Sequence, residues 1–420
     1  MQRISVPSPS KKSRGRDPTS IQSLDDDIIC IIFSYLGLFD VVRCSIVCKS
    51  WNAFILRSKL LQELCSKKRT SRIDWSEESL NTCLEELAME HHRSSLLKGP
   101  VFVDQWKGHS YRAEQCRVKM GLILSGVGDK VMRLWSLDSY NCVGEYAIPN
   151  GASLYDFDFD ESKIVGLVGT KICIWRRNGR RNLFPEREST FNKGLCMRYF
   201  DPHAVVGCED GTARVFDMYS KRCSQIIRMH SEAVTRICFS EDQLVLCGSS
   251  LGRITVSSLS SDHRVATLRA TDYKGIKALC FNPSSRLVFA GTTAGCTSCW
   301  DLRTMRRLWE RRVSPNVVYA MQHLHHDVST LLVGGLDGIL RVQDQNTGEV
   351  LSSYVLDYNT SCVDRGRVMI ERVSGRKLSK YEDIDKIHRR YRPPITSLAV
   401  GMKKVITTNN SKFIRVWKFE

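Results

Sequence analysis

The feature that most constrains the fold of this chain is a segment that recurs at a nearly constant interval after residue 100. Each copy ends on a short apolar run, as in Arg133-Leu-Trp135 and Arg415-Val-Trp417. Seven anchor residues align: Trp135, Trp175, Phe216, Ser257, Trp300, Gln343 and Trp417. Successive anchors are 40, 41, 41, 43, 43 and 74 residues apart. Such a period indicates structural repeats that bury their apolar faces against one another.

A period of about 40–45 residues is typical of β-propellers, in which each repeat forms a four-stranded blade. The anchors therefore predict a mainly β fold, a seven-bladed propeller over residues 99–420. The chain stops at Glu420, directly after the third strand of the last repeat, so that blade lacks its outer strand. Val101–Trp106 reads as a strand ahead of the first repeat. We expect it to complete the last blade, because closing the ring removes a long unpaired edge.

Residues 21–64 have a different pattern, that of a small all-α domain. Asp25, Asp26 and Asp27 suit the first turn of a helix, and apolar residues then recur at helical spacing from Ile28 to Leu36. Two further short helices are expected near Asp40 and Trp51. Three helices in about 40 residues make a marginal core, so this much apolar surface suggests that a partner covers part of it.

The same residues carry a family resemblance. Leu24-Asp-Asp-Asp-Ile-Ile-Cys-Ile-Ile-Phe-Ser-Tyr-Leu36, then Asp40, then Val47-Cys-Lys-Ser-Trp51, resembles an F-box, with Asp25 where that family usually has Pro. The resemblance implies docking onto a Skp-type adaptor, which links the F-box to a cullin and a RING subunit. Seven residues are candidates for that interface or for the core behind it: Leu24, Ile28, Ile32, Phe33, Leu36, Val47 and Trp51.

The remaining segments complete the predicted organisation. Residues 1–20 are a basic, Pro- and Ser-rich tail that we expect to be disordered. Residues 65–98 are expected to form a helical linker, since Leu80, Cys83, Leu84, Leu87 and Ala88 follow one helix face. The long last interval contains residues 358–392, which are polar and basic and are expected to be an insertion in the final repeat.

The repeats themselves resemble WD repeats. That family joins a His, a Ser or Thr, an Asp and the strand Trp by hydrogen bonds, and only the first repeat has the complete set: His109, Ser125, Asp129 and Trp135. These four residues are expected to be structural. Together the two resemblances imply an F-box/WD-repeat protein, a substrate receptor of a Skp–cullin–F-box ubiquitin ligase whose propeller binds an unknown protein to be ubiquitinated.

Nothing in the sequence predicts catalysis. We find no phosphate-binding loop, HExxH or GxSxG motif. The 17 cysteines are scattered, and Cys296 and Cys299 should point to opposite faces of a strand. His323, His325 and His326 lie beside Asp327 without a second ligand cluster, so a surface loop is the better interpretation. We therefore expect a binding protein without enzymatic activity, cofactor or metal.

The innermost strand of each repeat should present one residue to the mouth of the central channel. The pattern gives six candidates for substrate contact: Glu114, Tyr155, Thr235, Lys277, Tyr319 and Thr396. The third repeat, around Leu195, fits the pattern too loosely to assign a residue. This ring has one Lys, one Glu and no Arg, whereas related F-box propellers that read phosphorylated peptides place several Arg there. Positive charge is therefore not expected to gather at the mouth. Recognition is expected to use Tyr155 and Tyr319, with the alternative that both only line the channel.

Charge leaves two further alternatives open. The net charge is +17, and Arg303, Arg306, Arg307, Arg311 and Arg312 follow one strand. A basic scaffold propeller for RNA or chromatin would use such charge, although no recognition motif supports it; the simpler interpretation is a solvated surface. Trp300-Asp-Leu-Arg303 also resembles the WDxR box of receptors for another cullin ligase class. No secretory signal or membrane span is predicted, so we expect an intracellular protein, nuclear, cytoplasmic or both.

Overall fold

The computed structural model describes residues 24–420 except 69–76, 127, 129, 149–151, 178–180, 184–192, 261–263, 271–272, 325, 365–368, 380–381 and 402–403. The basic tail 1–20, Asp129 and His325 lie outside the described residues. Contacts divide the chain into two compact units, Met1–His91 and His92–Glu420, and each is described by itself. Among the described helices, none combines the length and apolar character needed to cross a lipid bilayer.

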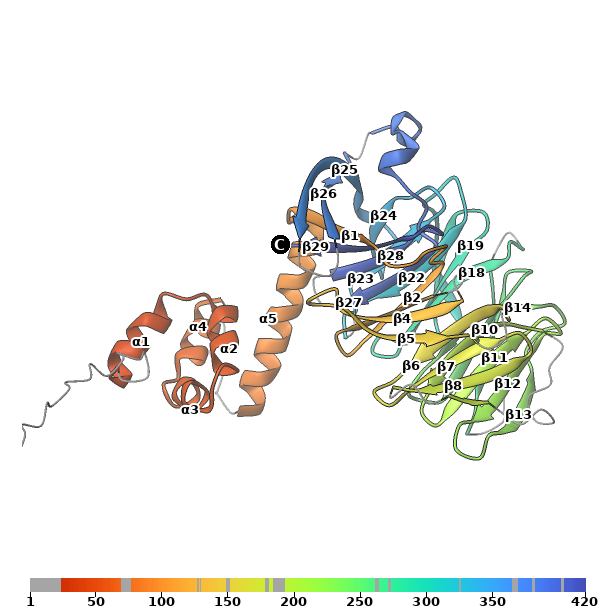
Figure 1. Cartoon of the computed structure of the whole chain (residues 1–420), viewed down its shortest axis with the longest axis horizontal. Coiled ribbons are helices and arrows are strands. Elements are labelled where there is room, and N and C mark those ends of the chain that lie inside the picture. Colours follow the sequence, from red (N-terminus) through yellow and green to blue (C-terminus); the bar gives the residue numbers. More distant parts are fainter. Residues whose placement is uncertain are drawn as a thin grey trace, which may run out of the picture. The chain divides into compact units, whose positions relative to one another are not determined.

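The first unit is helical (Figure 1). It contains α1 (Asp26–Ser34), α2 (Leu38–Ser45), α3 (Lys49–Arg57), α4 (Leu60–Lys68) and the larger part of α5 (Glu77–Lys98). The Asp25 side chain accepts a hydrogen bond from the Asp26 N–H at 2.8 Å, which confirms the predicted start of α1. Phe33 lies at the centre of the core, with its ring centroid 5.2 Å from Trp51 and 6.0 Å from Phe54.

The predicted linker helix contributes to both units. Leu80, Cys83 and Leu87 of α5 belong to the hydrophobic core of the helical unit. This part of the helix is therefore part of the folded unit and does not only link two domains. The end of α5 belongs to the second unit. There the Leu96 carbonyl accepts a hydrogen bond from the Tyr354 hydroxyl at 2.6 Å, and Lys377 donates to the Leu97 carbonyl at 2.7 Å.

The second unit is the predicted seven-bladed propeller, built from antiparallel strands (Figure 1). Five blades are separate four-stranded sheets, and each core lies between neighbouring blades, as where Leu134 packs with Phe157 and Trp175. The blades contain β2 (Gln115–Lys119), β3 (Leu122–Gly126), β4 (Val131–Ser136) and β5 (Cys142–Ala147); β6 (Leu154–Phe159), β7 (Lys163–Val168), β8 (Lys171–Arg176) and β9 (Arg181–Leu183); β10 (Gly194–Phe200), β11 (His203–Cys208), β12 (Thr212–Asp217) and β13 (Arg222–Arg228); β14 (Val234–Phe239), β15 (Leu244–Ser249), β16 (Arg253–Ser258) and β17 (Arg264–Arg269); and β18 (Ile276–Asn282), β19 (Leu287–Thr292), β20 (Cys296–Asp301) and β21 (Arg306–Arg312).

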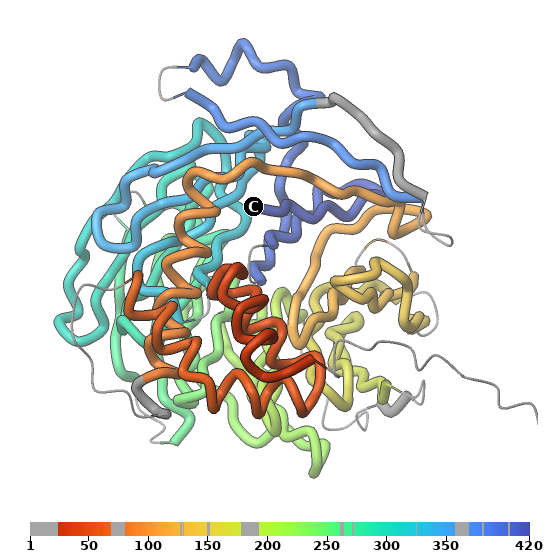
Figure 2. The backbone as a smooth tube through the Cα atoms, turned by 90° about the vertical axis from the view of Figure 1, so that its left-hand side faces the viewer, coloured from red at the N-terminus to blue at the C-terminus, as the bar shows by residue number. Residues whose placement is uncertain are grey.

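The sixth and seventh blades are joined into one nine-stranded sheet. The sixth contains β22 (Val318–His323), β23 (Thr330–Gly335), β24 (Leu340–Asp344) and β25 (Val350–Asp364); the seventh contains β27 (Ser397–Gly401), β28 (Lys404–Thr408), β29 (Phe413–Phe419) and β1 (Val101–Lys107). β1 pairs antiparallel with β29, which confirms the predicted closure of the ring by the N-terminal strand. Figure 2 shows the orange chain of β1 running beside the blue C-terminal strands.

The described part of the insertion is a structural bridge. Its strand β26 (Met369–Lys377) pairs with β25 on one side and with β1 on the other, so the seventh blade has a fifth strand. Two short 3-10 helices follow, η3 (Ile384–Lys386) and η4 (Arg389–Tyr391). Asp104 of β1 anchors this arrangement, with ion pairs to Arg372 of β26 at 2.9 Å and to Lys418 of β29 at 2.5 Å. Burial alone would raise the pKa of Asp104, but these two cations bring it below its ordinary value.

Asp327, from the His-rich segment, is a buried structural carboxylate. It accepts hydrogen bonds from Ser329 and Thr330, and Arg93 of α5 forms an ion pair with it at 2.8 Å. Burial alone would raise the pKa of Asp327, but the bonds from Thr330 and Ser329 and the charge of Arg93 bring it below its ordinary value. His323 also bonds backbone carbonyls, those of Leu324 and Phe281.

This geometry gives a first testable prediction. Asp327→Ala should lower the free energy of unfolding of the propeller by about 2–3 kcal/mol, because it leaves the buried N–H of Thr330 without an acceptor and breaks the Arg93 pair. Asp138→Ala is the matched control, since its carboxylate is 89% exposed and its pair with Lys404 should contribute about 0–1 kcal/mol. Denaturant titration measures both values. Equal stability of the two variants would contradict the role assigned to Asp327.

Candidate functional site

Among the described residues, helix α1 has one buried and one exposed apolar face. Ile29 and Phe33 are buried in the core of the helical unit. Ile28, Ile31, Ile32 and Tyr35 recur at the i, i+3, i+4 and i+7 positions of another face and are 46%, 58%, 38% and 85% exposed. We call these four residues the α1 stripe. Isolated exposed apolar residues are common on protein surfaces, whereas a contiguous apolar stripe is a candidate interaction site.

The structure sorts the seven predicted adaptor residues into two groups. Leu24, Ile28, Ile32 and Val47 are exposed, whereas Phe33 is buried and Leu36 and Trp51 pack partly buried against the core. The sequence interpretation did not include three exposed residues, Ile31, Tyr35 and Ile46. Ile46 is 83% exposed. The second helical stripe of α1 could have identified Ile31 and Tyr35 from the sequence. Ile46 could have been identified because it directly precedes the apolar Val47.

Three residues of the WD-type hydrogen-bond set of the first repeat are described, and they lie together: His109, Ser125 and Trp135. Ser125 is fully buried, and its hydroxyl is 2.7 Å from Nε2 of His109 and accepts a hydrogen bond from the Trp135 indole at 2.9 Å. Arg133 lies 3.3 Å from the other ring nitrogen of His109. The seventh blade has a related bond, from the Trp417 indole to Thr407 at 3.0 Å. These contacts connect β3 to β4 and to the segment before β2 in the first blade, and β28 to β29 in the seventh blade.

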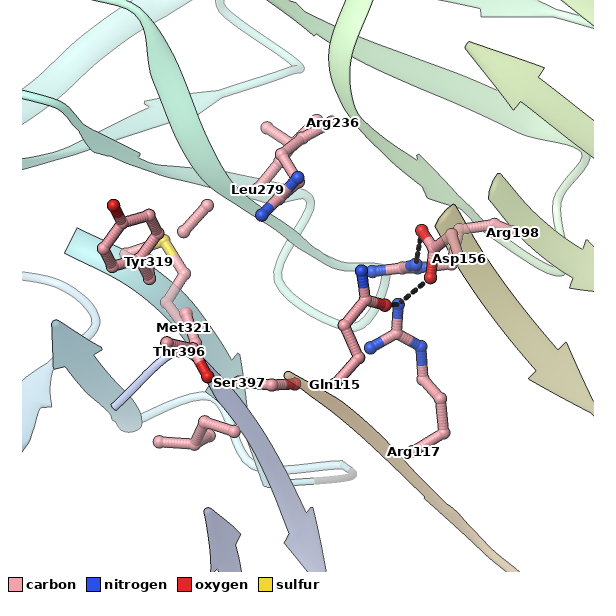
Figure 3. Close-up of a pocket in the computed structure, with 13 residues that line it drawn as sticks. Gln115, Arg117, Asp156, Arg198, Arg236, Leu279, Tyr319, Met321, Thr396 and Ser397 are labelled. Carbon is pink, nitrogen blue, oxygen red and sulfur yellow. Dashed lines mark hydrogen bonds and ion pairs between the residues drawn. The ribbon is translucent and has the colours of Figure 1, made fainter. Parts of the chain in front are cut away.

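A pocket lies among the innermost strands of the propeller (Figure 3). Strands of all seven blades contribute its lining, and its volume is about 60 Å³. The lining residues are Gln115, Arg117, Asp156, Arg198, Arg236, Ala278, Leu279, Tyr319, Ala320, Met321, Thr396, Ser397 and Leu398. We call this space the channel pocket. Its wall combines an aromatic ring, apolar side chains and charged groups, which is the composition of a site that selects a polar ligand.

Positive charge gathers in the channel pocket, contrary to the sequence-based expectation. Arg117 forms an ion pair with Asp156 at 2.9 Å, and Arg198 reaches the same carboxylate at 3.4 Å (Figure 3). For Arg236 the described residues offer a hydrogen bond to the Thr235 carbonyl at 3.0 Å and no carboxylate within ion-pair distance. Three Arg therefore face one Asp. Burial and the nearby charge of Arg198 lower the pKa of the Arg117 guanidinium.

The six predicted mouth residues have different roles in the structure. Tyr319 and Thr396 line the channel pocket. The hydroxyls of Thr235 and Thr396 donate to the carbonyls of Ile276 and Glu114, at 2.6 and 3.0 Å, and so link neighbouring blades. Tyr155 packs against an interblade core and is not one of the residues that line the pocket. Lys277 is half-buried, and burial together with Arg236 lowers its pKa.

The WDxR-like segment is paired within itself. The Arg303 guanidinium donates to both carboxylate oxygens of Asp301, at 3.1 and 3.0 Å. This bidentate pair is a strong geometry for an exposed Arg. No group of three or more His, Cys, Asp or Glu side chains suited to a metal ion occurs within the described part of the chain.

Comparisons with known proteins agree with both units. The family model for the F-box domain matches residues 21–63. An F-box/WD-40 repeat-containing protein of Arabidopsis thaliana is 53% identical over an alignment of 442 residues, which covers 98% of this chain and 97% of the relative. The crystal structure of the computationally designed Ika8 protein is similar with a TM-score of 0.54, covering 75% of this chain and 98% of that chain. It is 18% identical, so this likeness concerns the fold alone.

F-box/WD-repeat proteins generally act as adaptors that bring substrates to ligases of the Skp–cullin–F-box type. The relative's coverage extends through both the helical unit and the propeller. The helical unit carries the F-box match, and the second unit is a ring of four-stranded blades of the kind that WD repeats form. This chain therefore belongs to the F-box/WD-40 repeat proteins.

Proposed function

We propose that this protein is the non-catalytic substrate receptor of a Skp–cullin–F-box ubiquitin ligase. The observation that carries the proposal is the α1 stripe, an uncovered apolar face on a domain matched by the F-box family. A unit with so small a core gains from burying Ile28, Ile31, Ile32 and Tyr35 against a partner. A Skp-type adaptor is the partner that the family implies, and it connects the receptor to a cullin.

The channel pocket is the proposed contact for the protein to be ubiquitinated. Tyr319 supplies an aromatic ring there, and no hydrogen bond of its hydroxyl occurs among the described residues. Arg236 supplies a guanidinium without a carboxylate partner among the described residues. Tyr and Arg are the residue types that most often dominate binding energy at protein interfaces. The proposed mode therefore retains Tyr319 from the sequence-based set and adds Arg236 to it, whereas Tyr155 packs in an interblade core.

Pocket variants test this assignment. Tyr319→Ala combined with Arg236→Ala should reduce recovery of ubiquitinated targets at least tenfold in a reconstituted ligase, since hot-spot residues each contribute about 2 kcal/mol or more. The same variant should bind the adaptor normally, because the F-box is unchanged. Arg222→Ala, an exposed residue on β13, is the control. If the double variant modifies the same targets as the wild type, the channel pocket is not the substrate site.

A further inference from the structure

We propose that the outer edge of the fifth blade is a second docking surface, which binds an extended acidic segment of a partner protein by strand addition. This surface is separate from the channel pocket and from the F-box. It consists of β21 together with the groove between β21 and the outer strand of the fourth blade, β17.

The charge of β21 sets it apart from the other outer strands. Its seven residues include Arg306, Arg307, Arg311 and Arg312, all exposed, and one acidic residue, Glu310, which pairs with Arg307. Four positive charges against one negative charge leave a net charge of +3. The outer strands β13 and β17 carry two Arg each, and β5 carries one Glu and no basic residue. Charged side chains on an edge strand help to prevent aggregation. The outer strands β13, β17 and β5 have fewer charged residues than β21, so this role alone does not account for four Arg.

The backbone of β21 is open to a further strand. β21 is the last strand of its sheet and pairs only with β20 among the described strands. The chain itself shows how such an edge is extended, because β26 adds to the outer strand of the seventh blade. That fifth strand is fixed by charged cross-strand contacts, Arg372 with Asp104 and Glu371 with Gln105. An acidic extended segment would meet Arg side chains on β21 in the same way.

A groove beside the strand provides room for an apolar side chain of the bound segment. Its volume is about 490 Å³, and Tyr273, Met305 and Arg307 line its walls. Trp300 lines it as well, and its indole N–H donates no hydrogen bond within the described part of the chain. In the first blade the equivalent indole, that of Trp135, donates to Ser125. The residue of the fifth blade that is equivalent to Ser125 is Ala290, which has no hydroxyl to accept such a bond. The Trp300 indole N–H therefore has no acceptor among the described residues, and the side chain itself is 2% exposed.

An acidic peptide fits these features better than a nucleic acid does. Edge-strand N–H and C=O groups pair with another polypeptide backbone, and the groove offers an apolar wall at Met305. Arg306, Arg311 and Arg312 lie along one strand of seven residues, which suits a short extended segment. Single-stranded nucleic acid would use the same charge through its phosphates, without the strand pairing.

The test uses the full-length protein and a fluorescent peptide of alternating Glu and Val, long enough to span β21. Fluorescence anisotropy should detect binding. Arg311→Glu combined with Arg312→Glu should weaken it roughly tenfold or more, because charge reversal replaces attraction by repulsion. Arg222→Glu combined with Arg228→Glu on β13 is the control with the same charge change, and it should leave binding nearly unchanged. A peptide methylated on every backbone nitrogen keeps its side-chain charges, has no N–H to donate from either edge and should fail to bind.

Several results would overturn the proposal. One is the absence of measurable peptide binding, and another is an equal loss in the β21 and β13 variants. Equal binding of the methylated peptide would show that charge alone acts. A single-stranded oligonucleotide that binds more tightly than the peptide, with the same dependence on Arg311 and Arg312, would identify the surface as a nucleic-acid site instead.

Discussion

Val103→Pro should destabilise the propeller by about 3 kcal/mol or more, which makes it one of the most damaging single substitutions in this chain. Val103 is fully buried at the centre of β1, between Val373 of β26 and Trp417 of β29. Proline removes the backbone N–H and does not fit an inner strand. The damage should extend to ring closure, because β1 is the strand that joins the last blade to the bridge formed by β26.

A matched proline separates this effect from a general effect of proline in strands. Val143 lies on β5, an outer strand, is 57% exposed and falls in a bulge between the paired residues Cys142 and Gly144. Val143→Pro should therefore cost far less. Thermal melting and light scattering report the result: Val103→Pro should melt lower and aggregate, while Val143→Pro should remain monodisperse. Similar melting of the two variants would refute the role of β1 in closing the ring.

The second large effect should concern the α1 stripe. Ile28→Asp combined with Tyr35→Asp should weaken adaptor binding at least a hundredfold, because the complex would bury two charges without partners. Both side chains are exposed in the free chain, so the helical unit should keep its fold. Calorimetric titration with a Skp-type adaptor measures the affinity, and circular dichroism checks the helices.

Phe33→Ala provides the contrast. Phe33 is 2% exposed and contacts Trp51 and Phe54, so its truncation should cost about 3–5 kcal/mol of stability in the helical unit. Adaptor binding should then fail because the F-box unfolds. A stripe variant that loses helicity as Phe33→Ala does, or one that binds normally, would contradict the division of α1 into a core face and a docking face.

The sequence carried most of the information about the fold, because each blade contains its own signals. The anchors from Trp135 to Trp417 lie on the third strand of each blade, as their spacing predicted. β26 could not be found in this way. Its residues Met369–Lys377 do not alternate cleanly between apolar and polar types, and its charged side chains are satisfied by β1, far away in the sequence. A strand stabilised by cross-strand ion pairs resembles a polar loop until its partner is known.

The sites were harder to predict, for physical reasons. In α1 the sequence interpretation treated the apolar residues as a single set that could serve the core or the interface. The structure separates them into a buried stripe and an exposed stripe. In the propeller, the register of β14 shifts between Val234 and Arg236, so Arg236 reaches the channel pocket although Thr235 was the expected residue. Arg117 and Arg198 lie four positions after Ala113 and Gly194, at equivalent places in two blades. The recurrence of Arg at this position indicated positive charge in the channel. The sequence interpretation considered one position in each innermost strand, and Arg117 and Arg198 lie at a different one.

The most direct test of the receptor assignment is the binding of the full-length chain to a purified Skp-type adaptor at low and high salt. We predict a stable complex that persists at high salt, because the α1 stripe binds through apolar contacts that salt does not screen. Ile28→Asp with Tyr35→Asp should abolish the complex. If the wild-type chain binds no adaptor, or if binding persists in the stripe variant, the proposed role as a ligase receptor docked through α1 is wrong.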